Sequence, residues 1–380
     1  MSFYIPQGVP PVLTNSMARV ERRLPHPGEV LARVGGRVEP EDVIARTLKP
    51  APPLIINVSR QLGIPPHALE RAMYREVGNR VAQGEKLAST GRLGGRSCLA
   101  PISGMIAAVD TETGYVTLAP DPTSFDLVAN VRGLVMEVLP YEGVIIETLA
   151  TQAFGVVGFG DERNGVLRLL STDPSDVVTP DKITTRDAYA ILICGAGITA
   201  AALKRAVSEQ VRGIIVGGID EAELRTFFEW SGIGHWQIGQ SSWQLPDPRY
   251  FVDPKLTIVL TEGFGVQPMA QPIYDALSAN DRQEAMIEGF TSLRRPLRRP
   301  RVIVPQMRGG SAPEMPRVDV RVGAKVRLLD PEHLGQIAQV RSAPNQVRRL
   351  TSGVRAIAVE VVLPGQSPFW VPRTALEVME

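Results

Sequence analysis

The sequence predicts an α+β chain of several domains, in which a β-rich N-terminal module and a small C-terminal β-barrel flank a central α/β domain with a parallel sheet. Three observations predict it: a repeated strand-turn-strand motif near the N-terminus, alternating strand and helix patterns after residue 181, and short alternating strands after residue 318. A chain of 380 residues exceeds what one hydrophobic core usually organises. The expected parts are an extended arm (1–27), a β-rich domain (28–175), an α/β domain (181–305), a linker (306–317) and the barrel (318–380).

Composition is that of an ordinary globular protein. Hydrophobic residues make up 44% and charged residues 21%, and the formal net charge of +1 provides no overall field that would attract nucleic acid or membrane. The first residues carry no basic segment followed by an apolar run, and no stretch approaches eighteen apolar residues. We therefore expect a cytoplasmic protein without a membrane partner.

The two cysteines exclude a disulfide framework. Cys98 and Cys194 lie far apart, and neither belongs to a metal-spaced pattern. We expect no metal site and no cofactor.

The N-terminal motif occurs in residues 34–45 and again in residues 77–88, with apolar residues at matching places. Each copy is typical of a strand, an acidic turn and a second strand, so we predict a duplicated module in which Gly35 and Gly78 occupy equivalent turns. A short helix over residues 65–76, with prolines in its first turn, is expected to separate the copies.

The second copy is followed by residues 100–106, Ala-Pro-Ile-Ser-Gly-Met-Ile. Together these motifs make residues 28–120 resemble the barrel-sandwich hybrid of lipoyl and biotinyl carriers and related insert domains. Such carriers place a modified lysine at the tip of an exposed hairpin. Lys86 is the only lysine in either copy and occupies an apolar position before Leu87. The resemblance therefore implies the fold and not the carrier function.

A later run contains Gly155, Gly158 and Gly160 at the spacing of a tight loop. A phosphate cradle would need a helix directly after the loop, but residues 163–169 have the pattern of a turn and a strand. We interpret these glycines as structural.

The central domain begins with an apolar strand at 188–194, a helix at 199–210 and a second strand at 211–218. The helix would expose unpaired amides, and Gly195 and Gly197 would let an anion approach them. A tight turn also needs glycine when nothing binds, so a structural turn and an anion site are both open. Further along this domain, residues 261–265, Thr-Glu-Gly-Phe-Gly, and the later run rich in arginine and proline resemble a domain of uncharacterised bacterial proteins, which implies no activity.

Polar residues follow the later strands of the same sheet. Asp220 is expected to cap a helix over residues 221–228, and Thr261 and Glu262 end a strand that begins near residue 256. Because the ends of parallel strands share one edge, we expect Cys194, Asp220, Thr261 and Glu262 to face one crevice, which would bind an anion or small ligand.

Catalysis in that crevice is a weaker hypothesis. Cys194 would act as a nucleophile beside a helix N-terminus, or Asp220 and Glu262 as an acid/base pair. The only histidine of the domain, His235, is expected in a loop or edge strand instead of beside Cys194. We therefore expect a protein that is not an enzyme.

Arginine dominates the segment after the central domain. Prolines keep this segment from forming a helix, so it could bind phosphate or nucleic acid; a solvated linker, or arginines paired with acids of the central domain, is the alternative. The arginines are Arg294, Arg295, Arg298, Arg299 and Arg301.

The C-terminal strands include residues 333–338, His-Leu-Gly-Gln-Ile-Ala, with a central glycine. Residues 318–378 thereby resemble the KOW-type SH3-like barrel of transcription and ribosomal proteins, which implies binding to RNA or protein. Four arginines are expected around its second loop, where they form a basic face or pair with nearby acids. These arginines are Arg341, Arg348, Arg349 and Arg355, and the acids are Asp319, Asp330 and Glu332.

Two of the three parts thus belong to binding folds. We expect a non-catalytic scaffold or adaptor with a protein partner or self-association. A nucleic-acid-binding factor that uses Arg348, Arg349 and the arginine linker is one alternative. An α/β domain that binds a small ligand or acts as an enzyme is the other.

Overall fold

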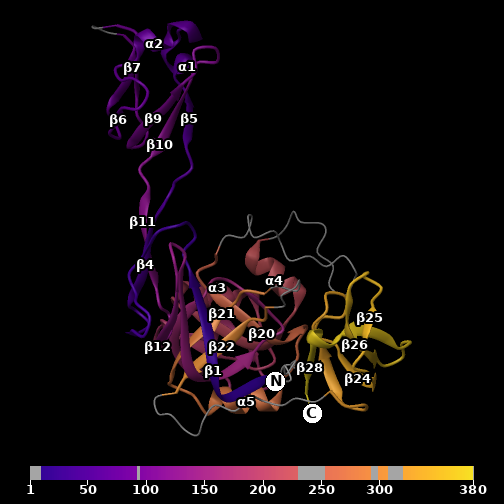
Figure 1. Ribbon diagram of the computed structural model, residues 1–380. Helices are drawn as coiled ribbons and strands as arrows, with labels where there is room; N and C mark the ends of the chain where they lie inside the picture. Colours follow the sequence, from indigo (N-terminus) through magenta and orange to yellow (C-terminus); the bar gives the residue numbers. More distant parts are fainter. Residues whose placement is uncertain (1–9, 92–94, 230–252, 292–297, 307–319, 380) are drawn as a thin grey trace.

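The computed structural model describes residues 10–91, 95–229, 253–291, 298–306 and 320–379 (Figure 1). Its body is an 11-stranded mixed sheet. In the order of the sheet, the strands are β14 (Val157–Phe159), β20 (Thr257–Phe264), β19 (Gly213–Ile219), β17 (Ala190–Ile193), β15 (Arg163–Leu169), β21 (Glu284–Glu288), β22 (Arg301–Pro305), β13 (Gly143–Phe154), β12 (Gly133–Leu139) and β3 (Arg37–Val38), with β1 (Val12–Arg23) paired to β13.

The central part of this sheet is parallel, as predicted. β15, β17, β19 and β20 run in one direction. Helices α3 (Ala200–Ser208) and α4 (Glu221–Phe228) bury their apolar sides on one face, and α5 (Gln271–Ser278) does so on the other. Because both faces are covered, β17 and β19 are apolar throughout, which is the pattern that made them recognisable. Their short companions β16 (Val177–Val178) and β18 (Gly197–Ile198) form a separate parallel pair.

The first copy of the repeated motif forms the end of the body sheet; we call it the outer copy. It consists of β3, β12, the first half of β13, and the antiparallel pair β4 (Val43–Lys49) and β11 (Thr123–Val128), with β2 (Glu29–Val30) beside β4. Its core includes Val38, Ile44, Val135 and Ile146.

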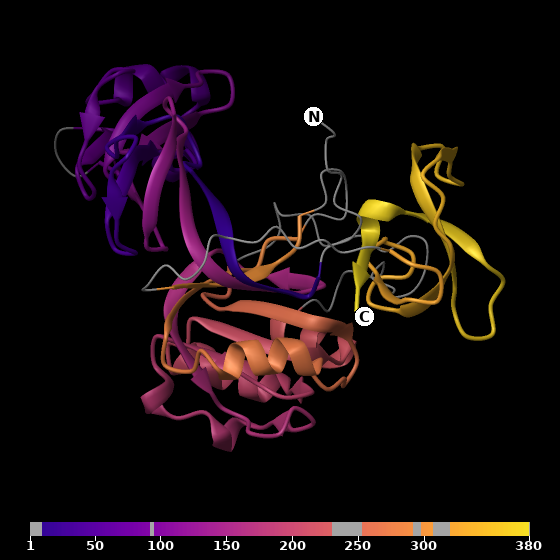
Figure 2. The same cartoon turned by 60° about the horizontal axis from the view of Figure 1, so that its bottom comes forward.

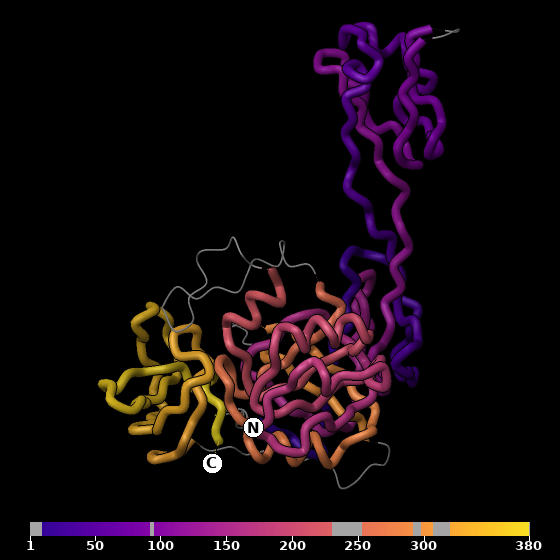
Figure 3. Tube along the Cα trace, turned by 180° about the vertical axis from the view of Figure 1, so that it is seen from behind, coloured from indigo at the N-terminus to yellow at the C-terminus, as the bar shows by residue number. Residues whose placement is uncertain are grey.

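We call the second copy the inner copy, because its residues lie between strands of the outer copy in the sequence. In space it stands beyond the outer copy, at the far end of the molecule (Figures 1 and 3). It has its own core around Val81, Leu87 and Ile106. Its elements are a four-stranded sheet of β5 (Leu54–Asn57), β10 (Tyr115–Pro120), β9 (Gly104–Val109) and β6 (Arg80–Val81), the hairpin β7 (Lys86–Ser89) and β8 (Ser97–Leu99), and helices α1 (Val58–Leu62) and α2 (Leu69–Ala72), the latter preceded by a 3-10 turn, Pro66–Ala68.

The two copies share hydrogen bonds at equivalent positions, so Gly35 and Gly78 occupy equivalent turns, as predicted. The Gly35 amide donates to the Val135 carbonyl at 2.8 Å, and the Gly78 amide donates to the Ile106 carbonyl at 2.8 Å. Both glycines have positive φ, +79° and +89°, which glycine adopts without strain.

The acidic turn recurs in the same way. The Asp42 carboxylate accepts the Glu39 amide at 2.8 Å, and the Glu85 carboxylate accepts the Ala82 amide at 3.0 Å. In each turn the carboxylate therefore accepts a backbone amide of the same turn, which explains why both motifs have an acidic residue at this position.

The inner copy is inserted into a hairpin of the outer copy. β4 and β11 pair as β7 and β8 do, with a register shift at the same place in each pair. In the inner copy a short loop closes this hairpin, whereas in the outer copy the chain continues from β4 into β5 and returns from β10 to β11. The paired strands β4 and β11 therefore form a stalk that carries the inner copy (Figure 3).

The C-terminal part is a six-stranded antiparallel sheet on the other side of the body from the inner copy (Figure 2). Alternate residues such as Val326, Val340 and Val361 form its core. Its strands are β23 (Lys325–Leu328), β24 (Ile337–Ser342), β25 (Val347–Arg349), β26 (Arg355–Val362), β27 (Phe369–Pro372) and β28 (Leu376–Val378), with 3-10 turns at Arg373–Ala375 here and at Pro180–Lys182 and Thr185–Asp187 in the body.

The N-terminal segment and the first domain boundary differ from the expectation. The expected extended arm contains β1, which pairs with β13 along its length from Val12–Ala153 to Arg23–Gly143. The expected boundary between 175 and 181 falls within one sheet, because β15 pairs with β17 across it. The helix expected at 65–76 is shorter, ending at Ala72.

Candidate binding surfaces

The turn after β17 uses its own amides internally. The Ala196 amide donates to the Asp176 carbonyl at 2.7 Å, and the Gly197 amide also points to it at 3.4 Å. A Cβ at Gly195 would lie 2.4 Å from the same oxygen, so close packing requires this glycine. The amides of Ala196 and Gly197 are therefore engaged within the protein, and ligand binding by Gly195 and Gly197 stays a prediction.

The beginning of α3 is also occupied. Thr199 caps the helix by accepting the Ala202 amide, and the Glu223 carboxylate accepts the Ala200 amide at 2.6 Å. The protein thus supplies its own anion at the helix N-terminus, where the partial positive charge favours one.

Cys194 lacks the surroundings of a nucleophile. Its side chain is fully buried in the core, and burial raises the pKa of its thiol to about 12. A thiol with this pKa stays protonated at neutral pH, and only the thiolate is reactive. His235, considered as a partner for Cys194, lies outside the described residues.

The polar residues expected in one crevice have separate partners. Asp220 caps α4 through the Ala222 amide, as predicted. Thr261 and Glu262 are buried, and the Glu262 carboxylate accepts the Ala270 amide at 2.8 Å and pairs with Arg327. Asp220 and Glu262 are therefore structural in their contacts and do not form an acid/base pair.

A chain of buried charges joins the C-terminal domain to the body. Arg327 pairs with both Glu262 and Glu377, and Glu377 also accepts from Arg299 at 2.6 Å. All four side chains are less than a tenth exposed. Burial raises the pKa of the Glu262 carboxyl, although Arg327 beside it favours the ionised form. Breaking such a chain leaves an unpaired buried charge, so it fixes how the two parts meet.

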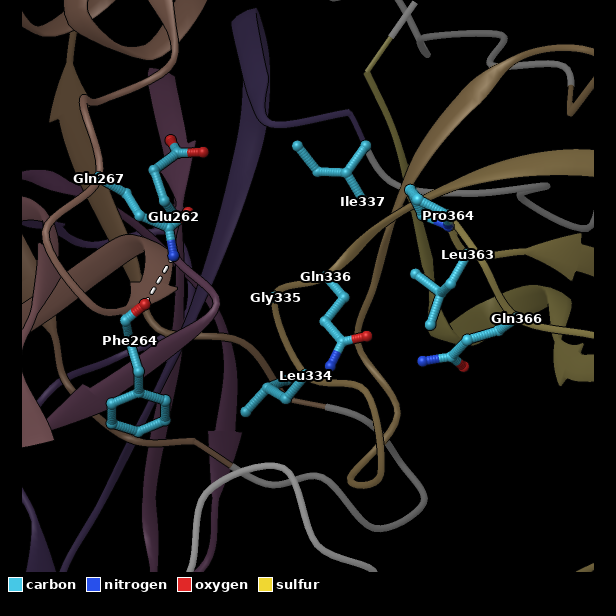
Figure 4. Close-up of a pocket in the computed structure, with 10 residues that line it drawn as sticks. All are labelled: Glu262, Phe264, Gln267, Leu334, Gly335, Gln336, Ile337, Leu363, Pro364 and Gln366. Atoms are coloured by element: carbon cyan, nitrogen blue, oxygen red, sulfur yellow. Dashed lines mark hydrogen bonds between the residues drawn. The ribbon is translucent and has the colours of Figure 1, made fainter.

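A hollow of about 490 Å³ lies beside this chain, between the end of β20 and the C-terminal domain (Figure 4). Phe264, Leu334 and Leu363 give it apolar walls, and Gln336 and Gln366 add side-chain amides. Of the residues predicted for a ligand site, Glu262 alone lines it.

The arginine segment divides into three groups. Arg294 and Arg295 lie outside the described residues. Arg299 is buried and donates to the Gly155 carbonyl at 2.9 Å, and Arg301 donates to Glu288 at 2.7 Å. Arg298 is half-exposed, with its guanidinium 5.1 Å from the centre of the Phe290 ring.

Arg301 pairs with Glu288 of the central domain, as the alternative had it, whereas Arg299 pairs with Glu377 of the C-terminal domain. These ion pairs count against the expected role of both arginines in nucleic-acid binding. Gly158 and Gly160, from the glycine-rich run of the sequence, are structural, as interpreted. A Cβ at Gly158 would lie 2.7 Å from the Gly289 carbonyl oxygen, and one at Gly160 would lie 2.5 Å from the Leu256 oxygen.

The hairpin of β25 and β26 carries the exposed arginines of the C-terminal domain. Arg349 faces Arg355 directly across the hairpin, and Arg348 places its guanidinium 3.8 Å from the centre of the Trp370 ring. Like charges on directly opposed residues destabilise a strand pair. Within the described part of the chain, none of these three arginines forms an ion pair; Asp330, considered as a partner, pairs with His333.

Comparisons with protein-family models, curated proteins and solved structures found no match. No helix of the described residues is long and apolar enough to cross a membrane. Over the same residues, no group of three or more His, Cys, Asp or Glu is arranged to hold a metal ion.

Proposed function

We propose that the protein is a non-catalytic cytoplasmic scaffold that holds a macromolecular partner through its β modules. The observation that carries this proposal is the projection of two modules, the inner copy and the arginine hairpin, from different sides of the body (Figures 1 and 2). The internal engagement of Cys194, Asp220 and Glu262 supports a non-catalytic role. We interpret the two N-terminal copies as barrel-sandwich-like modules and the C-terminal domain as an SH3-like barrel of the KOW type.

Nucleic acid is the second candidate partner, and the arginine hairpin favours it. Arg348, Arg349 and Arg355 have no carboxylate partner among the described residues, so their guanidinium groups are free to meet phosphate. Trp370 beneath Arg348 offers an aromatic surface next to these charges. Arginine together with an aromatic ring is the usual composition of a site for single-stranded nucleic acid.

Affinity capture with the full chain separates the two candidates. Lysate of the native host is divided, one half is treated with nuclease, and each half is passed over wild type and over an Arg348→Ala/Arg349→Ala/Arg355→Ala variant. A protein scaffold retains its partner after nuclease treatment. A nucleic-acid-binding factor loses it, and the triple variant loses it in both halves.

Binding to a mixed RNA pool at several salt concentrations gives the quantitative readout. Three phosphate contacts predict that log K falls with log salt with a slope of about −2 for single strands. The variant Arg19→Ala/Arg23→Ala/Arg46→Ala, in the outer copy, is the matched control with the same loss of charge. No binding at low salt contradicts the nucleic-acid candidate, and no captured protein in either half contradicts the scaffold.

A further inference from the structure

The duplicated module allows the solvent face of one copy to be compared with that of the other, residue by residue. In the outer copy, the outward side of the sheet formed by β1, β13 and β12 carries Arg19, Glu21, Arg23, Leu134, Glu137, Ile145 and Glu147. Hydrogen-bond register places six residues of the inner copy at the same positions: Ile55, Asn57, Met105, Ala108, Thr117 and Ala119. Pro53, two residues before Ile55, takes the seventh position, that of Arg19. Five of the seven outer positions are ionisable, and none of the inner ones is.

The outer face is a charged surface that is largely solvated, although Ile145 within it is buried. Arg19 pairs with Glu137 at 3.1 Å, and Arg23 pairs with Glu21 and Glu142. The inner face, at the same positions of the same fold, exposes apolar side chains. Ile55 is 60% exposed and Met105 is 42% exposed. Because the fold accepts charge at these positions, its absence in the inner copy is a property of this face and not a requirement of the module.

We propose that this inner face, defined by the seven residues above, packs against the same face of a second copy of the chain. Sheets pack face to face at a spacing of about 10 Å with interdigitating side chains, and the uncharged residues of this face can pack in that way. A symmetric pair brings each residue near its own counterpart, so a charged face would oppose like charges whereas the inner face opposes none. The stalk holds this face beyond the body, where a second chain can reach it (Figure 3).

The size of the face sets the strength of the pair. The seven residues lie on or beside three strands, β5, β10 and β9. A strand of six residues spans about 20 Å, and three strands span about 14 Å across the sheet. Two such faces bury on the order of 600 Å² in total, which is about half of the 1,200 Å² of a stable interface. The dimer is therefore expected to be weak and to form reversibly as the protein concentration rises. The dimer uses one face of the inner copy and leaves the arginine hairpins uncovered, so each assembly would carry two of them.

Sedimentation velocity of the full chain at increasing concentration tests the proposal. Wild type should shift from monomer to dimer, and the shift should persist at high salt, because apolar contact is not screened. The variant Ile55→Glu/Ala108→Glu installs the residue types that the outer copy carries at Glu21 and Glu137, which the fold accommodates. Since each glutamate enters a symmetric interface twice, we expect its dissociation constant to rise about a hundredfold or more.

The matched control is Glu21→Gln/Glu137→Gln, in the outer copy, which should dimerise as wild type does. Circular dichroism and melting confirm that both variants are folded, and Ala108→Glu alone provides a milder substitution with the same expected direction. Wild type that stays monomeric throughout, or a dimer that survives Ile55→Glu/Ala108→Glu, overturns the proposal. A dimer that dissociates at high salt also overturns it, because it would be held by charges elsewhere.

Discussion

The outer and the inner copy follow the same path of strands but end differently. In the outer copy the third strand, β13, has 12 residues and continues into the body sheet, where its second half pairs with β22. In the inner copy the equivalent strand, β10, has 6 residues and returns to the stalk. The shared turns and core positions therefore define the module. The length of one strand and the side chains of one face decide whether the module is part of a larger sheet or stands apart.

The largest effect on stability is expected at two glycines that lie against the backbone of the neighbouring strand: Gly133 in β12, which lies against β13, and Gly104 in β9, which lies against β10. A Cβ at Gly133 would lie 2.6 Å from the Glu147 oxygen, and one at Gly104 would lie 2.2 Å from the Ala119 oxygen. Each Gly→Ala substitution should cost about 2–4 kcal/mol, because backbone must shift. Gly133→Ala should reduce amide-exchange protection throughout the body, whereas Gly104→Ala should reduce it only in the inner copy. Equal loss in both regions from either variant would contradict separate stability of the copies.

The next test replaces a buried side chain of the outer copy by the residue that the inner copy has at the same position. Arg22 in the outer copy is 4% exposed, donates to the Val128 carbonyl at 3.1 Å and pairs with Glu162 of the body, whereas the inner copy has Ile56 there. Arg22→Ile should lower the free energy of unfolding of the body by about 2–3 kcal/mol, since Glu162 and the carbonyl lose their donor.

Chemical denaturation monitored on the body measures this loss. Arg19→Ile, at the exposed pair with Glu137, is the control and should cost less than about 1 kcal/mol. Equal effects at the two positions would mean that Arg22 does not anchor the outer copy to the body.

A smaller effect is expected at the equivalent turns. Gly35 and Gly78 have open space around the missing Cβ, so the cost of Gly35→Ala or Gly78→Ala comes from positive φ alone, about 1–2 kcal/mol. The two substitutions should cost the same, each in its own copy, as measured by thermal melting with amide exchange. Gly91→Ala is the control, because that glycine is equally open and does not have positive φ. Unchanged melting of both variants would mean that the turns are not equivalent constraints.

The smallest effect concerns the acidic turn of the inner copy. The Ala82 amide, followed by Arg75, lowers the pKa of the Glu85 carboxyl below its usual 4.5. The unfolded chain therefore binds this proton first as pH falls, and the stabilisation is present above 4.5 and is lost as pH falls through the folded pKa. Amide exchange of the inner copy at several pH values should show this loss in wild type and not in Glu85→Gln. Identical pH profiles would rule out the contribution of this turn.

Local features of this fold could be predicted from the sequence. The turns at Gly35 and Gly78, the buried strands β17 and β19, and the cap at Asp220 each depend on neighbouring residues, so pattern and turn chemistry were sufficient. β1 was missed because prolines surround it, and its pairing partner β13 lies more than a hundred residues away.

The roles of charged side chains could not be predicted in the same way. Arg299 and Arg327 share one acid, Glu377, and each of these residues belongs to a different stretch of sequence. Arg299 and Arg348 are both arginines in basic runs, yet one is buried in an ion pair and the other lies exposed over Trp370. Which arginine is free depends on tertiary contacts, about which a basic run carries no information.

The inserted arrangement also determines an order of events during folding. The hairpin of the inner copy closes a loop of 7 residues between Ser89 and Ser97, whereas the stalk pairs Lys49 with Thr123 across 73 intervening residues. Closing the longer loop costs about 2 kcal/mol more in chain entropy if that loop is unfolded. Once the inner copy has folded, its two ends leave from the adjacent strands β5 and β10, and most of this cost has already been met. We therefore expect refolding to begin in the inner copy and to proceed down the stalk, with the body sheet completed last.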